Sequence, residues 1–201
     1  MRQLEKFFNN PKVYNIIQCL LAFAGGKAVF KKIQEYLDVK PGDSVLDVGC
    51  GTGKYTRIFM RADYTGIDTS DEYLNYARKR YPFGKFINMD AVKLTFPDQS
   101  FRFVFSASTF HHLSDEEAEL AAAEMKRVCQ DNGAVYIIDN VFPRKINFVG
   151  YLLFKLDRGS YQRNFRELEK LLSPQGFRVA DTKLKGSFPY RYAIFKHEKK
   201  A

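Results

Sequence analysis

The chain has 201 residues, of which 45% are apolar and 27% are charged, and this composition excludes an intrinsically disordered or fibrous protein. The net charge of +9 arises entirely in residues 141–201, where 14 basic side chains face 5 acidic ones, because residues 1–140 hold 18 of each. This distribution disfavours a uniformly basic nucleic-acid binder. It predicts that one face, built late in the chain, meets an anionic molecule or a membrane surface.

Cysteine and histidine usage excludes two further classes. The three cysteines lie far apart, without the spacing of a disulfide framework or a zinc site: Cys19, Cys50 and Cys129. The histidines form no metal-binding pattern either, since His111 and His112 are adjacent and His197 is remote. We therefore expect a cytoplasmic protein with no metal ion in its site.

Residues 13–24 are the first predicted helix, because apolar side chains recur along one face of this stretch. Ala22-Phe23-Ala24 also resembles the cleavage site of a signal peptide, but Asn15 and Gln18 interrupt the apolar run, which favours the helix. No apolar run in the sequence reaches the ~18–20 residues that a membrane-spanning helix needs.

The remaining elements alternate between helices and strands. In chain order, the pattern predicts a helix over 27–37, a strand over 44–48, a helix through 55–59 after a glycine-rich turn, a strand over 64–67, a helix from 69 to about 81 and a strand over 86–89. It then predicts a strand over 101–107, a helix from 114 to 128, a turn at 132–133, a strand over 135–138, a helix around 165–172 and strands over 177–183 and 190–195. Capping boxes mark two of the helix starts, Thr69-x-x-Glu72 and Ser114-x-x-Glu117. Such alternation implies a parallel sheet covered by helices on both faces.

The most informative stretch is Asp47-Val48-Gly49-Cys50-Gly51-Thr52-Gly53, at the end of the first predicted strand. Glycines at such a turn let backbone N–H groups approach a ligand closely, because no Cβ intervenes. The dinucleotide pattern G-x-G-x-x-G fails at Lys54, and the phosphate-loop pattern fails at Tyr55. What remains is an acidic residue followed by three alternating glycines.

That pattern closely resembles motif I of the class I S-adenosylmethionine-dependent methyltransferases. The best match is their type 11 branch, which includes enzymes of ubiquinone and menaquinone biosynthesis. The resemblance extends from about Lys40 to Asn140, with similar stretches at 64–70, 88–91, 96–104 and 111–113 in the order and spacing of the family. Arg102 stands where the family usually has Asp, a departure that we expect to be superficial.

The resemblance implies an α/β, Rossmann-like class I methyltransferase fold, with a mostly parallel seven-stranded sheet, its last strand antiparallel, and helices on both faces. It implies a single methyltransferase domain over 1–201. Within it, we expect N-terminal cap helices over 1–40, a cofactor-binding core over 41–140, and a substrate-side segment with the C-terminal strands over 141–201.

The cofactor implied by the resemblance is S-adenosyl-L-methionine. Asp68 is expected to accept hydrogen bonds from both ribose hydroxyls, Asp90 and Ala91 to meet the adenine, and Asp47 to orient the turn and favour the cationic groups. The full set of expected cofactor-binding residues is Asp47, Gly49, Gly51, Gly53, Asp68, Thr69, Asp90, Ala91 and Ser106, the last bordering the methionine part. Purely structural roles stay open for the three aspartates, as helix caps, turn residues or solvated strand ends. Cys50 is interpreted as a small buried residue.

Methyl transfer requires alignment, exclusion of water and, for some acceptors, removal of a proton. His111 or His112 is a candidate base, and the alternative is that one packs under the following helix while the other caps it. Tyr14 could close over the cofactor or simply pack in its helix. An apolar stretch with basic flanks, residues 144–163, predicts a substrate wall that includes Phe148, Leu152 and Arg158. A helix packed on its own domain or in a dimer interface remains the alternative.

The predicted function is therefore methyl transfer to a small, amphiphilic or anionic acceptor. The alternatives are a non-catalytic S-adenosylmethionine-binding protein and a methyltransferase acting on RNA or protein. Residues 106–110 lack the Asn/Asp-Pro-Pro-aromatic signature of enzymes that methylate amino groups of nucleic-acid bases, so no stable nucleic-acid partner is expected. Contact of the basic C-terminal third with a membrane surface fits the same charge pattern.

Overall fold

The computed structural model describes residues 26–141, 160–182 and 192–198, whose strands pair in one sheet of seven. Its strands are β1 (Ser44–Val48), β2 (Asp63–Asp68), β3 (Lys85–Asn88), β4 (Phe101–Ala107), β5 (Cys129–Asn140), β6 (Arg178–Asp181) and β7 (Tyr192–Glu198). The helices are α3 (Gly26–Tyr36), α4 (Asp71–Arg80), α5 (Asp115–Val128) and α7 (Phe165–Leu172), with short 3₁₀ turns η1 (Thr56–Phe59), η2 (Phe110–His112) and η3 (Ser173–Gln175).

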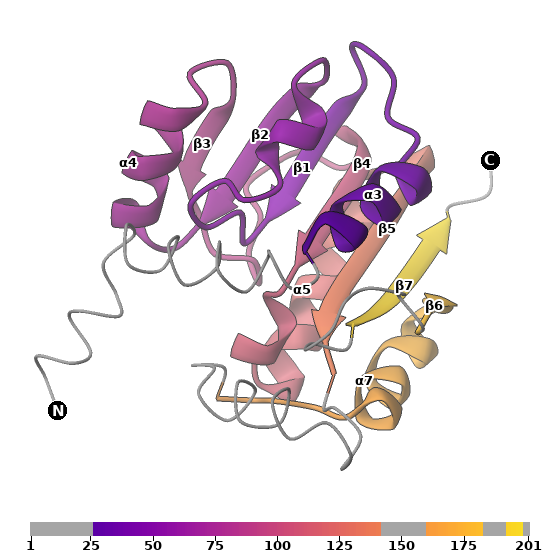
Figure 1. The fold of residues 1–201 in the computed structure, drawn as a ribbon. Coiled ribbons are helices and arrows are strands. Elements are labelled where there is room, and N and C mark those ends of the chain that lie inside the picture. Colours follow the sequence, from indigo (N-terminus) through magenta and orange to yellow (C-terminus); the bar gives the residue numbers. More distant parts are fainter. Residues whose placement is uncertain (1–25, 142–159, 183–191, 199–201) are drawn as a thin grey trace, which may run out of the picture.

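The sheet has the order β3-β2-β1-β4-β5-β7-β6 (Figure 1). β1 to β5 pair in parallel, and β7 is antiparallel to both β5 and β6. The strand order reverses between β1 and β4, since β2 and β3 lie to one side of β1 while β4 and β5 lie to the other. In open α/β sheets, ligands bind at the carboxyl ends of the strands beside such a reversal. The predicted mostly parallel, seven-stranded sheet with an antiparallel last strand is confirmed.

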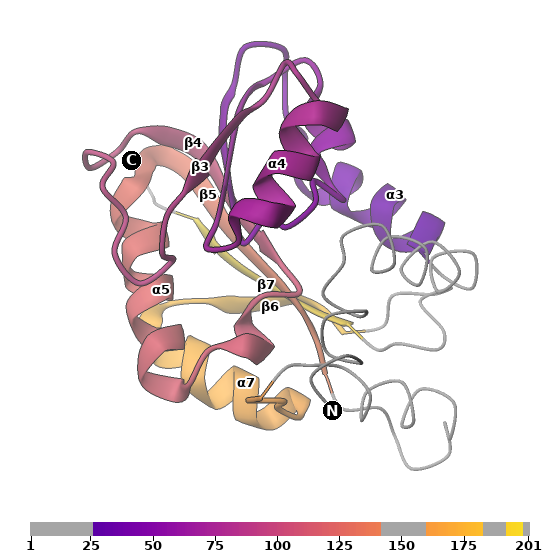
Figure 2. The same ribbon diagram turned by 90° about the vertical axis from the view of Figure 1, so that its left-hand side faces the viewer.

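Helices cover both faces of the sheet, with α3 and α4 on one side and α5 and α7 on the other (Figure 2). One core cluster joins Ile33 of α3, and Leu37 just after that helix, to Tyr64 and Phe105. Leu74 and Ala77 of α4 belong to the same cluster. The second core cluster packs α5 and α7 against the opposite face of the sheet. The inward face of α5 consists of residues that are each fully buried: Ala118, Ala121, Ala122, Met125 and Val128.

Three sequence predictions are wrong in detail. Ser70, not Thr69, caps α4, since the Ser70 hydroxyl accepts the Tyr73 N–H and the helix begins at Asp71. The expected helix through 55–59 is only the 3₁₀ turn η1. Just three residues separate η1 from β2, so the chain must return to the sheet before an α-helix could develop.

The third wrong prediction is the turn at Asn132-Gly133, which lies within β5. The pairing of β5 with β4 shifts register here, between Phe101 and Phe103. A Cβ on Gly133 would lie 2.3 Å from the Arg102 carbonyl oxygen. The glycine therefore allows two backbone segments to lie close together where the strand is irregular. In the sequence alone, such a glycine cannot be distinguished from one in a turn.

Arg102 itself pairs with Asp43, with the guanidinium Nη1 atom 3.0 Å from a buried carboxylate oxygen. The contact lies at the start of β4, at the opposite end of that strand from the glycine turn. The departure from the family pattern at this position therefore leaves the carboxyl edge of the sheet unchanged.

Candidate active site

The glycine turn after β1 is built by three residues with positive φ: Gly49 (75°), Gly51 (54°) and Gly53 (78°). The N–H groups of Gly49 and Cys50 both donate to the Ile67 carbonyl at 2.9 Å, which holds the turn against the end of β2. A Cβ on Gly49 would lie 2.3 Å from the Thr109 hydroxyl oxygen, and one on Gly53 would lie 2.9 Å from the Tyr81 ring. A Cβ on Gly51 would meet nothing within 4 Å. Two glycines thus allow packing, while Gly51 borders open space.

Asp68 ends β2 directly beside this turn. Its Oδ2 atom accepts the Gly51 N–H and its Oδ1 atom accepts the Ser70 N–H, both at 2.9 Å. Burial raises the pKa of Asp68 above its ordinary value, and the hydrogen bonds from backbone N–H groups oppose this rise. A carboxylate offers about four lone-pair sites, so Asp68 keeps acceptor capacity beyond its contacts with backbone N–H groups. The structure therefore fixes the orientation of the carboxylate that the sequence singled out.

Asp47 is almost fully buried below the turn and is linked to a hydroxyl chain. The Tyr64 hydroxyl donates to Asp47 Oδ2 at 2.8 Å, and the Thr56 hydroxyl donates to the Tyr64 oxygen at 3.0 Å. Burial raises the pKa of Asp47 to about 7, with Asp68 adding to the rise and the Tyr64 hydrogen bond opposing it. Asp47 thus supports the turn from beneath and titrates near neutrality.

Cys50 lies in the same turn and is buried. A Cβ on Gly66 would approach its sulfur to 2.8 Å. Burial raises the pKa of the Cys50 thiol well above its ordinary value, which disfavours the thiolate. The interpretation of Cys50 as a small packing residue agrees with both observations.

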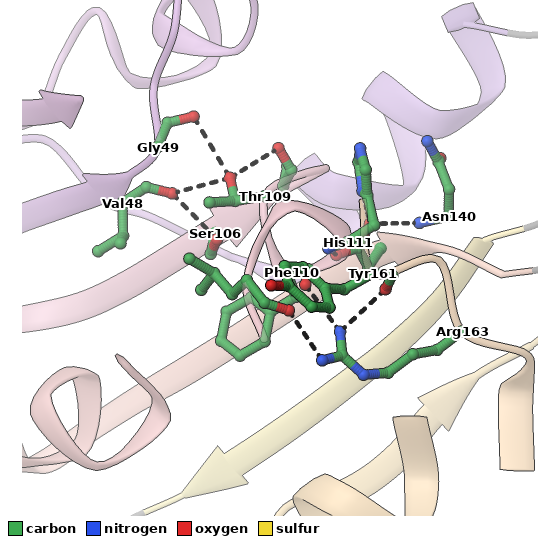
Figure 3. Close-up of polar contacts among 12 residues, drawn as sticks. Val48, Gly49, Ser106, Thr109, Phe110, His111, Asn140, Tyr161 and Arg163 are labelled. Atoms are coloured by element: carbon green, nitrogen blue, oxygen red, sulfur yellow. Dashed lines mark hydrogen bonds and ion pairs between the residues drawn. The ribbon is translucent and has the colours of Figure 1, made fainter. Parts of the chain in front are cut away.

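The Val48 carbonyl is a meeting point for two hydroxyl groups from β4 and the residues after it (Figure 3). The Ser106 hydroxyl donates to it at 3.0 Å and the Thr109 hydroxyl at 3.3 Å. Ser106 is fully buried, so in this structure it supports the turn after β1 and does not face the open edge of the sheet. Sequence reasoning missed Thr109, whose side chain fills the space that Gly49 leaves.

The expected adenine-side residues follow β3 at the rim of the carboxyl edge. Asp90 is exposed, and its Oδ1 atom accepts the Val92 N–H at 3.1 Å, while Ala91 is half-buried. Thr69 is exposed, and its carbonyl accepts from the Asn88 side-chain amide at 3.2 Å. Asp90 is thus a turn residue in this structure, and its second carboxylate oxygen is available at the rim.

The two candidate bases differ in their surroundings. His111 is buried, and its Nδ1 atom lies 2.6 Å from Asp139 Oδ1, whereas His112 is exposed. Their rings lie 4.2 Å apart between centroids. Neither histidine caps α5, because Ser114 forms the predicted capping box with Glu117, so the capping alternative for a histidine is wrong.

Asp139 holds the candidate base His111, and sequence reasoning missed it. A signal was present, because Asp139 and Asn140 are polar residues at the end of an apolar strand, as Asp47 and Asp68 are. Arg163, the last of the basic residues that flank the predicted substrate wall over 144–163, does not line an exposed wall. It is buried, and its guanidinium donates to the carbonyls of Phe110 and Tyr161 (Figure 3), as well as to Leu113 and to Asp115. It holds η2, and therefore His111, in place.

The expected substrate residues Tyr14, Phe148, Leu152 and Arg158 lie outside the described residues, as does the predicted helix over 13–24. Among residues 26–141, 160–182 and 192–198, no three His, Cys, Asp or Glu side chains gather as a metal site would require. None of the helices in the described part of the chain combines the length and apolar character that a bilayer span takes.

Comparison with known proteins identifies this arrangement. Residues 46–137 match the type 11 family model, whose description is methyltransferase domain. A demethylmenaquinone methyltransferase from Thermotoga maritima is 33% identical over 142 residues, which cover 68% of this chain and 61% of that protein. Residues 46–137 form a class I methyltransferase domain of the type 11 branch.

Other similar proteins differ in the acceptors that their names state. A mouse protein named probable tRNA methyltransferase 9B is 34% identical over 108 residues, which cover 53% of this chain and 24% of that protein. The crystal structure of an S-adenosylmethionine-dependent methyltransferase from Aquifex aeolicus has a TM-score of 0.65 and 25% identity, covering 83% of this chain and 88% of that one. This chain spans 61% of the length of the demethylmenaquinone methyltransferases that it matches.

The cofactor of the methyltransferase domain is S-adenosylmethionine, and the residues present fit it. The backbone at Gly51 faces space that a side chain would fill, and the Asp68 carboxylate beside it has lone pairs left for a sugar diol. Asp68, the glycine turn, and the rim residues Asp90 and Ala91 are the groups that could hold it.

Proposed function

We propose that the chain catalyses transfer of the methyl group of S-adenosylmethionine to a small amphiphilic acceptor. The observation that carries the proposal is the contact between Asp68, at the end of β2, and Gly51, in the turn after β1, beside the reversal of strand order between β1 and β4. This contact places a carboxylate of fixed orientation beside a turn that borders open space. A nucleoside with an amino-acid tail needs both, the carboxylate for its sugar hydroxyls and the turn for its tail.

In this proposal the residues divide by role. Asp68 holds the ribose hydroxyls, Asp90 and Ala91 hold the adenine, and the glycine turn lies against the amino-acid part. Asp47 supports the turn, and its carboxylate form favours the cationic groups of the cofactor. The cofactor supplies an activated methyl group, so the chain itself has to align the acceptor, exclude water and accept a proton where the acceptor carries one.

A small acceptor is favoured by the similarity to demethylmenaquinone methyltransferases, whose named substrate is a quinone. The relative named as a tRNA methyltransferase covers a smaller share of this chain, 53% against 68%. Arg163, one of the basic residues that make the C-terminal third positive, is buried and binds backbone carbonyls and Asp115, so its charge does not face a nucleic acid. RNA is therefore the second candidate acceptor. Contact with a membrane surface is a separate proposal, in which the basic residues outside the described ranges would meet the anionic surface.

Calorimetry with S-adenosylhomocysteine tests the cofactor site. Asp68→Ala should weaken binding by roughly 2–4 kcal/mol, because two charge-assisted hydrogen bonds are lost. Asp68→Asn is the matched control, because it keeps the volume of the side chain and removes only its charge. Urea unfolding of both variants shows whether a loss of affinity comes from a loss of folding. An unchanged dissociation constant in a folded Asp68→Ala variant would refute this role.

The acceptor is tested separately by release of S-adenosylhomocysteine with 1,4-naphthohydroquinone or with unmodified tRNA. Product formation with the hydroquinone alone supports the small-molecule proposal. Product formation with tRNA alone would replace it with the second candidate. Cofactor binding without turnover of either substrate would favour a non-catalytic binding protein.

A further inference from the structure

The connection from β3 to β4 carries Asp90 and Ala91, and it contains no helix or strand over residues 89–100. Connections this long without secondary structure of their own are uncommon in compact domains and are often functional. Two contacts support its beginning. The Met89 N–H donates to the Asp68 carbonyl at 3.2 Å, and the Lys93 N–H donates to the Asp90 carbonyl at 3.3 Å. Both are long for N–H···O hydrogen bonds, so the firmest support of the loop comes from elsewhere.

Glu124 and Arg127, near the end of α5, supply that support. Glu124 Oε2 accepts the Leu94 N–H at 2.8 Å. Arg127 donates from Nη2 to the Leu94 carbonyl at 2.8 Å and from Nη1 to the Phe96 carbonyl at 2.9 Å. The backbone carbonyl of Arg127 accepts the Gln99 N–H at 3.0 Å. The loop therefore runs alongside α5, as Figure 2 shows, and is bonded to it at several backbone atoms.

Every N–H group of the Arg127 guanidinium has an acceptor. Besides the two loop carbonyls, Nε donates to Glu124 Oε1 at 2.7 Å, Nη2 donates to Glu124 Oε2 at 2.9 Å, and Nη1 donates to Asp98 Oδ1 at 2.7 Å. This use of all five donors depends on the planar fork of arginine, which lysine does not offer. The hydrogen bond from Arg127 holds the pKa of Glu124 below its ordinary value, so the pair is ionised at neutral pH. We call these two side chains the α5 clamp.

The α5 clamp acts together with apolar packing. Leu94 is buried in the core cluster that contains the inward face of α5, and Phe96 packs against that cluster. Leu94 lies one turn beyond Asp90, because the Lys93 N–H closes that turn on the Asp90 carbonyl. The backbone at Asp90 and Ala91 is therefore held between the end of β3 and a fixed point at Leu94.

We propose that Glu124 and Arg127 are positioning residues of the cofactor site, which hold the loop over 89–100 so that Asp90 and Ala91 select the adenine base. The α5 clamp acts through the loop and takes no part in methyl transfer. A loop that is already ordered in the free protein loses less conformational entropy when the ligand binds, so the clamp raises both affinity and selectivity. This inference rests on the proposed function and deepens it by naming residues that determine recognition of the base.

S-inosylhomocysteine is the probe that separates positioning from general stability. It differs from S-adenosylhomocysteine only in the base, where a carbonyl oxygen replaces the amino group and the ring nitrogen beside it carries a hydrogen. The Asp90 carboxylate accepts hydrogen bonds and has none to offer that carbonyl, and the Ala91 N–H would face a second donor. A well-placed loop therefore disfavours the inosyl compound, because a site built for a hydrogen-bonding group rejects an analogue that lacks it.

The first measurement is amide hydrogen exchange of the ligand-free protein, followed by NMR. The Leu94 N–H should exchange slowly in the unmodified protein and at least fivefold faster in Arg127→Met, although its acceptor on Glu124 is retained. Faster exchange would show that Arg127 orders the loop. Equal exchange in the two proteins would overturn the proposal, since the loop would then be held without the clamp.

The second measurement is calorimetry with the two ligands. Arg127→Met should weaken binding of S-adenosylhomocysteine at least tenfold and lower the ratio of adenosyl to inosyl affinity at least fivefold. Arg127→Lys keeps the charge but offers three donors, so it should lose most of the selectivity as well. A purely structural role would leave the ratio unchanged in a variant that urea unfolding shows to be folded, and that outcome in Arg127→Met would overturn the proposal.

Arg102→Met is the matched control, because Arg102 also pairs its guanidinium with a carboxylate, that of Asp43, but outside the loop. It should change both affinities less than twofold, and a larger change in the ratio would overturn the assignment to the clamp. Combining Glu124→Ala with Arg127→Met should weaken binding less than twofold beyond Arg127→Met alone, since both residues act through one loop. Full additivity would show two independent effects and would overturn the clamp.

Asp90→Ala distinguishes failure of this inference from failure of the proposed function. It should abolish the preference for the adenosyl ligand. Selectivity lost in Asp90→Ala but kept in the clamp variants would overturn this inference and leave the cofactor site standing. Selectivity kept in Asp90→Ala would overturn the assignment of Asp90 to the adenine, and this inference with it, without touching the role of Asp68. An unmodified protein that does not bind S-adenosylhomocysteine would overturn the proposed function itself.

Discussion

Gly49 and Gly51 stand two residues apart in one turn, and alanine should affect them in opposite ways. Both have positive φ, which costs an L-residue about 1–2 kcal/mol. The Cβ of Gly51→Ala meets nothing within 4 Å, so the loss of stability should stop at this strain. The Cβ of Gly49→Ala would lie 2.3, 2.6 and 2.9 Å from three atoms of Thr109, and overpacking adds about 1–3 kcal/mol.

The two alanine variants should therefore differ in which property they change most, stability for Gly49→Ala and cofactor affinity for Gly51→Ala. Urea unfolding should give a loss of about 1–2 kcal/mol for Gly51→Ala and about 2–5 kcal/mol for Gly49→Ala. Calorimetry with S-adenosylhomocysteine should show that Gly51→Ala weakens binding at least tenfold, because its methyl group occupies the space where the cofactor approaches.

A double-mutant cycle isolates the steric contribution. Thr109→Gly removes all three clashing atoms, so it should restore about 1–3 kcal/mol in the Gly49→Ala background relative to its own effect in the unmodified protein. A Gly51→Ala protein that binds the cofactor like the unmodified chain would refute the placement of the cofactor. Equal destabilisation by the two alanines, with no coupling to Thr109, would refute the packing argument.

Three further predictions concern stability. Arg163→Ala should lower the free energy of unfolding by about 2–4 kcal/mol, measured by urea unfolding, because backbone carbonyls that accept from the buried guanidinium lose their donor; a loss below 0.5 kcal/mol would contradict this. Asp47→Asn should flatten the pH dependence of the free energy of unfolding between pH 4 and 7. The Asp47 carboxyl has a pKa of about 7 in the folded protein against 3.8 in the unfolded chain, so the folded protein binds the proton more tightly. Roughly 4 kcal/mol of unfolding free energy that is present below pH 4 is therefore lost as the pH rises through 7. Identical pH slopes for the two proteins would count against the buried carboxyl. Gly133→Ala should cost at least about 2 kcal/mol and lower the melting temperature, since the Arg102 carbonyl at 2.3 Å is backbone and cannot rotate away; a neutral substitution would show that β5 shifts freely.

The sequence predicted the sheet, its order of elements and the cofactor edge, because these features depend on local patterns. Apolar runs ending in Asp47 and Asp68 mark strands whose polar ends meet at one edge of a parallel sheet. Alternating glycines mark a turn that only residues without Cβ can form at positive φ. The errors arose where one local pattern serves two structures, as at Gly133, where a glycine after asparagine sits in a strand irregularity instead of a turn.

The contacts between distant segments were decided only by the tertiary structure. His111 and Asp139 are 28 positions apart, and their pairing depends on the parallel register of β4 and β5, which no short window of sequence contains. Arg163 illustrates the same limit, because its charge predicted an exposed rim while folding buried it on the carbonyls of η2. Sequence thus determined which groups are available at the edge of the sheet. Packing determined their partners, because most buried donors and acceptors form hydrogen bonds with groups that folding brings close.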